Sequence, residues 1–240
     1  MQVVLRRIRR RREVLAGLAM ILAVASYVTS LLLDFNFVSP YATLQEDLSY
    51  LTNHSRNLQI SVWAWLGTSL ITFLSIPPYL LLFHRRLKVF HYVNALWLLG
   101  ASAGFLMMGI AGIELYQELS KGLETSMQGT DEQVWISLLS RFQDEQFYRR
   151  IGSSFIGLFA IGMGLTRFKM RRVPIFAVAL LIICGPTMIF FNWYDPDHLI
   201  RTAAMAGIVI GVTTFSVRVI NKGLEAYHNG LEEKQEEATP

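Results

Sequence analysis

Six charged residues stand at the ends of long apolar runs, where a charge can bind a ligand or hold a membrane protein together. They are Glu114, Arg149, Arg150, Asp195, Asp197 and Arg201. An arginine guanidinium can take two oxygens of a phosphate or carboxylate, and a carboxylate can neutralise an arginine. Two interpretations follow. One is a structural cluster in which Glu114 or Asp197 pairs with Arg201; the other is an outward pocket for an anionic or zwitterionic headgroup.

The elements that must position these charges are membrane spans. Val14–Leu33 carries no charge and would be about 30 Å long as a helix, the thickness of a hydrocarbon core. With 52% hydrophobic residues, the chain is too apolar for an ordinary soluble domain. We predict an all-α, polytopic membrane protein, a six-helix transmembrane bundle with short exterior amphipathic helices. Its single domain covers 1–220, with spans at about 14–33, 60–83, 89–113, 149–166, 174–191 and 199–220, and an acidic cytoplasmic tail follows at 221–240.

Charge predicts the orientation of these spans. Six arginines precede the first span, and arginine-rich ends stay in the cytoplasm. Alternation then places both termini in the cytoplasm of a plasma (inner) membrane, and all six boundary charges at the exterior side. An alternative is that Arg11-Arg12 belongs to a twin-arginine export signal cut after Ala23-Val24-Ala25. The uninterrupted apolar run favours an uncleaved anchor.

Two capping-box patterns predict short exterior helices. Thr43–Glu46 begins one with Leu44, Leu48 and Leu51 on one face, and Thr130–Gln133 begins another ahead of the fourth span. The second has an apolar stripe formed by Trp135, Leu138, Leu139 and Phe142. In the second span, Pro77-Pro78 should kink or end the helix.

Small residues mark faces where helices can approach closely. Gly100 and Gly104 lie four apart in the third span, and the sixth carries a second ladder, Ala203, Gly207 and Gly211. His91 and Asn94 share a face of the third span, and we expect them to form polar contacts between helices. A bis-histidine haem site is disfavoured because the other histidines fall at different depths.

The sequence holds no recognisable catalytic or metal-binding motif. It has no metal-type Cys/His spacing, no phosphate-binding loop, no G-x-S-x-G and no H-E-x-x-H, and its single cysteine is Cys184. We therefore expect no catalytic residue, no metal and no cofactor. The net charge of +4 follows from basic cytoplasmic segments, so it implies no nucleic-acid partner.

The order of these parts resembles a family of bacterial multi-spanning proteins catalogued as a domain of unknown function, DUF4386. The resemblance lies in an N-terminal anchor, an exterior polar helix, a span ending in a basic turn, and three short segments. These are Ala95-Leu96-Trp97 through Gly104 and Glu114, Tyr148-Arg149-Arg150-Ile151-Gly152 and Arg172-Val173-Pro174. The resemblance implies a topology and no activity.

Three classes of function remain. A binding, accessory or scaffold-type membrane protein needs only close-packing faces and exterior helices, which the sequence supplies. The alternative is a small-molecule or lipid transporter or channel, weakened because no span has an ionisable residue at its centre. An enzyme is less favoured than either. The expected partners are membrane lipids and another membrane protein or a second copy of the chain.

Overall fold

The computed structural model describes residues 2–34, 55–83, 89–125, 132–166, 173–194 and 199–237. Apart from the two residues before α6, everything in these ranges is α-helical, which confirms the all-α fold class for this part of the chain. The helices are α1 (Gln2–Asp34), α3 (Ser55–Phe83), α4 (Val89–Thr125), α5 (Glu132–Thr166), α6 (Ile175–Tyr194) and α7 (Leu199–Glu237).

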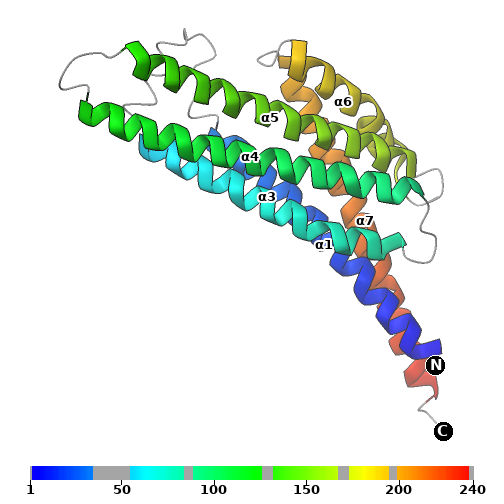
Figure 1. Ribbon diagram of the computed structural model, residues 1–240. Coiled ribbons are helices and arrows are strands. Elements are labelled where there is room, and N and C mark those ends of the chain that lie inside the picture. The colour runs from blue at the N-terminus through cyan, green and yellow to red at the C-terminus, as the bar shows by residue number, and fades with distance from the viewer. Residues whose placement is uncertain are drawn as a thin grey trace.

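The helices pack in a closed cyclic order (Figure 1). Each contacts the next along the chain, and α7 returns to pack on α1. Neighbours run in opposite directions, so both chain termini lie at one end, where α1 and α7 extend beyond the other helices. We call this the terminal end. The opposite one, where α4 ends and α5 begins, is the distal end.

Five of these helices are long and apolar enough to cross a membrane. α5 is not among them, because Arg149 and Arg150 precede an apolar run of only fifteen residues, Ile151–Leu165. The five stretches that qualify are Arg12–Leu33, Arg56–Leu82, Val89–Ser120, Ile175–Tyr194 and Leu199–Glu225.

Large apolar side chains cover the outer surface of the molecule. Leu32, Trp63 and Ile183 are each more than 60% exposed. Many buried positions instead hold hydroxyl groups: Ser30, Ser61, Thr68, Ser69, Thr72, Ser75, Ser102, Ser153 and Ser216. A soluble protein keeps large apolar side chains inside, so this distribution suits a lipid environment.

Hydroxyl pairs join α3 to its neighbours in the interior. Ser69 and Ser102 bond reciprocally, each donating to the other's backbone carbonyl, at 2.8 Å and 3.0 Å. Ser30 of α1 and Thr68 of α3 share a bond of 2.7 Å between their hydroxyl oxygens. The rings of Tyr27, Trp65 and Phe105 pack together in a buried aromatic cluster, with Tyr27 meeting Trp65 edge to face.

Glycines form the closest contacts between α4, α5 and α6. A Cβ on Gly104 of α4 would lie 2.7 Å from the Cα of Gly152 of α5. Gly157 of α5 and Gly185 of α6 oppose each other in the same way: a Cβ on either would lie within 2.9 Å of the other's carbonyl oxygen.

The other predicted packing residues lie in two settings. Gly100 faces the ring of Phe155, while Gly207 and Gly211 face Cys184 and Leu181 of α6. Ala203, at the start of the second ladder, is exposed.

Two local predictions need correction, and the last helix is longer than the predicted span. The expected exterior helix around residues 130–142 and the fourth span form one continuous helix, α5. Pro77 and Pro78 do not end α3, which runs on to Phe83. The predicted tail at 221–240 continues α7 as a helix as far as Glu237. The exterior helix expected at Leu44–Leu51 lies outside the described residues.

Candidate functional site

The described members of the predicted cluster of boundary charges come from three helices. Glu114 belongs to α4, Arg149 and Arg150 to α5, and Arg201 to the first turn of α7. Asp195 and Asp197 lie outside the described residues. The cluster as a whole therefore stays a prediction, and what can be assigned is the setting of each described member.

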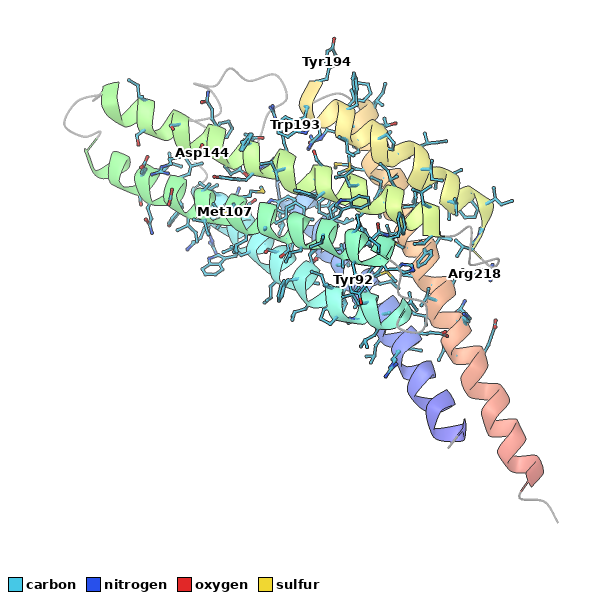
Figure 2. The ribbon with its side chains drawn as sticks, turned by 45° about the vertical axis from the view of Figure 1, so that its right-hand side comes forward. Tyr92, Met107, Asp144, Trp193, Tyr194 and Arg218 are labelled. Carbon is cyan, nitrogen blue, oxygen red and sulfur yellow. The ribbon has the colours of Figure 1, made fainter. Side chains whose placement is uncertain are left out.

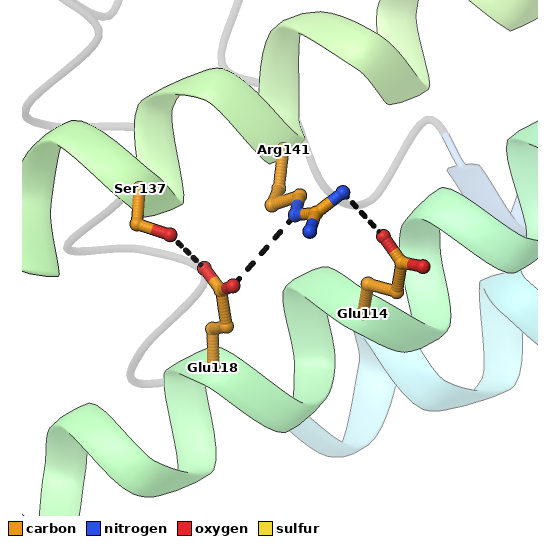
Figure 3. A network of polar contacts seen from close by, with 4 residues as sticks. All are labelled: Glu114, Glu118, Ser137 and Arg141. Atoms are coloured by element: carbon orange, nitrogen blue, oxygen red, sulfur yellow. Dashed lines mark hydrogen bonds and ion pairs between the residues drawn. The ribbon is translucent and has the colours of Figure 1, made fainter.

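Glu114 pairs with a residue that the sequence analysis did not consider. Its Oε2 lies 2.5 Å from Nη1 of Arg141, one helix over on α5 (Figure 3). The Nε of Arg141 lies 3.7 Å from Glu118, which accepts a 2.7 Å hydrogen bond from Ser137. These four side chains clamp the projecting parts of α4 and α5. The sequence did contain a signal for this pair. Glu114 and Glu118 are one helical turn apart and form an acidic edge, and Arg141 is the only arginine in the part of α5 that precedes Arg149.

Arg149 is neutralised within its own helix. Its Nη2 donates to Oε1 of Glu145 over 2.8 Å, with both side chains largely buried at 16% and 10% exposure. Because the acid precedes the arginine by four residues, both groups lie on one face of α5. Arg149 is thus held by a structural ion pair.

Arg150 is held through its backbone instead. Asn192 of α6, fully buried, donates from Nδ2 to the Arg150 carbonyl oxygen at 2.6 Å and also contacts the hydroxyl of Ser154 at 3.0 Å. Trp193 donates its indole N–H to the same hydroxyl at 3.0 Å. These bonds fasten α6 to α5 around Arg150. The Arg150 side chain itself is half-buried, and its Nε is covered without a hydrogen-bond acceptor in the described structure.

Aromatic side chains lie on the outer surface next to these hydrogen bonds between α5 and α6. The rings of Phe147 and Trp193 meet edge to face with centroids 5.9 Å apart, and both are about half exposed. Phe190 and Tyr194 stack at 5.3 Å on the neighbouring face of α6. Figure 2 shows Trp193 and Tyr194 together at the distal end of α6. Exposed tryptophan and tyrosine at a helix end are typical of the membrane–water interface.

His91 and Asn94 form a second polar group, nearer the terminal end. Both are buried, and Asn94 donates to the hydroxyl of Tyr79 at 3.0 Å. The amide oxygen of Asn94 lies against Gly162, where a Cβ would overlap it. These contacts join α3, α4 and α5. No group of three or more metal-ligating side chains occurs within the described ranges.

The described polar side chains of this region supply guanidinium groups, carboxylates and amide donors, the groups that position an anion or join helices. No family model, no curated protein and no solved structure matches the chain. The function proposed below therefore rests on the sequence and this geometry.

Proposed function

We propose that the chain is an integral membrane protein with six spans, both termini on the cytoplasmic side of a plasma (inner) membrane, serving as a binding or accessory scaffold. The proposal that α5 also crosses the membrane, as the sixth span, is supported by how α5 packs. Over Gly152–Gly164 it contacts apolar α4 on one side and apolar α6 on the other. A segment that packs between two membrane-crossing helices over this length lies in the hydrocarbon core with them. Its two arginines stand at one end, where long stems reach the interface.

The scaffold role is supported by how the interior polar groups are used. The buried carboxylates Glu13 and Glu145 each have a cationic partner, Lys222 at 3.6 Å and Arg149 at 2.8 Å. Interior hydroxyls bond from helix to helix, and glycines bring backbones into contact. Such contacts fix helices relative to one another. A proton-coupled transporter instead needs an ionisable group in mid-span.

Cysteine accessibility tests the topology. In a Cys184→Ser background, single cysteines replace Ser126, between α4 and α5, or Ala238, after α7. Six spans place these two sites on opposite sides of the membrane. If α5 did not cross, the chain would reach Ala238 on the same side as Ser126. Labelling of both cysteines by an impermeant reagent from one side would therefore refute the six-span proposal.

The alternative function, a transporter or channel without an intramembrane ionisable site, is favoured by one feature. α3 presents five buried hydroxyl residues, which could line a polar path: Ser61, Thr68, Ser69, Thr72 and Ser75. Spin labels at Leu70 and Ile183, both strongly exposed, would report the distance between α3 and α6 in liposomes. A single narrow distance distribution supports a scaffold. Two populations would support alternating conformations and the transporter.

A further inference from the structure

Arg150 differs from the other two arginines in this part of α5. Arg141 pairs with Glu114, and Arg149 pairs with Glu145. The Arg150 side chain forms no ion pair with a carboxylate in the ranges that the structure describes, although its Nε is covered by protein. A guanidinium keeps its charge at every physiological pH, and a partly desolvated charge requires a counter-ion.

Hydrogen bonds between α5 and α6 hold the backbone around Arg150 in place. Asn192 bonds to its carbonyl oxygen, and one turn later Ser154 accepts from both Asn192 and Trp193. Phe147, one turn earlier, packs on Trp193 and stands half exposed beside it. Under the proposed topology these aromatic side chains mark the headgroup layer, so Arg150 lies at the level of lipid phosphates.

We propose that Arg150, on the seam between α5 and α6, binds a phosphate-bearing anion, supplied at this depth by the headgroup of a phospholipid. The fork of a guanidinium matches two phosphate oxygens, and the fixed seam spares the cost of ordering the site on binding. Arg149 would not share this role, because Glu145 already neutralises it. The assignment of the anion to a lipid headgroup rests on the proposed function. The assignment of a phosphate to Arg150 rests only on the contact between α5 and α6.

The test compares variants of the full chain, delipidated in detergent, by native mass spectrometry with added phosphatidylglycerol. Arg150→Gln should weaken lipid association about tenfold, the loss expected for a charge-assisted contact. Arg141→Gln is the matched control, since it makes the same change of charge on the same helix at an arginine that already has carboxylate partners. It should bind phosphatidylglycerol as the unmodified protein does.

A second variant tests the proposal independently, in case Arg150→Gln does not fold. Phe147→Glu places a carboxylate three residues before Arg150, at an exposed site, where it should pair with the guanidinium and compete with the phosphate. Its lipid association should fall as well. Unchanged association in the folded variants, or an equal loss in Arg141→Gln, would overturn the proposal.

Inorganic phosphate distinguishes the two sources of the anion. Lipid association that persists in millimolar phosphate supports a headgroup site. Displacement of the lipid by phosphate, in an Arg150-dependent manner, would overturn the lipid assignment and keep the phosphate site. The topology assay does not involve Arg150, so a one-sided labelling result there would refute the six-span proposal whatever the lipid data show.

Discussion

Gly104 of α4 and Gly152 of α5 meet backbone to backbone. A Cβ built on Gly104 would lie 2.7 Å from both the Cα and the nitrogen of Gly152. Backbone atoms cannot rotate out of the way as a side chain can. The close approach of α4 and α5 at this point therefore depends on the absence of a methyl group at Gly104.

Gly104→Ala should lower the stability of the folded protein, because α4 and α5 must separate to admit the methyl group. Overpacking of this kind costs roughly 1–3 kcal/mol, and Gly104→Leu should reduce the folded yield in detergent. Gly67→Ala is the control, since nothing lies within 4 Å of a Cβ at that position. Thermal unfolding should separate the two alanine variants. Equal midpoints would show that the helices are not in backbone contact.

Gly162 and Asn94 should be coupled. A Cβ on Gly162 would overlap the amide oxygen of Asn94, which is fully buried and tied to Tyr79. Gly162→Ala should therefore destabilise the protein, whereas in an Asn94→Ala background the same change should cost little. The difference between the two costs, measured by thermal or denaturant unfolding, is the interaction energy. An identical cost in both backgrounds would show that the amide does not occupy that space.

The ion pair of Glu114 should be detectable but weak. Its carboxylate and the Arg141 side chain are about 40% exposed, and exposed pairs contribute roughly 0.2–1 kcal/mol. A double-mutant cycle with Glu114→Gln and Arg141→Gln should give a coupling in this range that shrinks in high salt. Glu114→Gln and Arg201→Ala should be additive. A larger coupling to Arg201 than to Arg141 would restore the partner first expected from the sequence.

Five long apolar helices could be predicted because each is a local property of the sequence. An uncharged apolar run long enough for the bilayer must be helical there, since lipid offers no hydrogen bonds to the backbone. Positions such as Gly104 and Gly207 could be singled out because only small residues permit close helix contact. The residues that these glycines contact on neighbouring helices could not be predicted. Which helix Gly104 meets depends on how α4 is rotated within the ring, and no local pattern encodes that.

The errors have physical causes as well. The sequence analysis divided α5 because its first half is polar and its second half apolar. Both halves are compatible with one helix, and both contact α4. Prolines at 77 and 78 remove two hydrogen bonds, but α3 is held beyond them by Tyr79, which accepts from Asn94 of α4. Neighbouring helices compensate for prolines in this way in membranes. The role of Asn192 was missed because a single asparagine near a helix end carries no distinctive pattern.

Asn192 should be a principal attachment between α5 and α6. It is fully buried, and its amide donates to the Arg150 carbonyl and to the Ser154 hydroxyl. Asn192→Ala should cost roughly 1–3 kcal/mol, because it leaves both acceptors without this donor and opens a small void. Asn192→Asp, although equal in size, should not restore stability, since a carboxylate oxygen would then face a carbonyl oxygen.

Thr187→Val provides the control for Asn192 on the same helix. The Thr187 hydroxyl bonds only to the carbonyl of Ile183 in its own helix, at 2.8 Å, so its loss should change stability by less than about 0.5 kcal/mol. Thermal unfolding in detergent, followed by tryptophan fluorescence, should place Asn192→Ala and Asn192→Asp well below Thr187→Val. If all three variants unfolded at the same temperature, the bonds from Asn192 would not be what fixes the seam around Arg150, and the rigid site proposed there would lose its support.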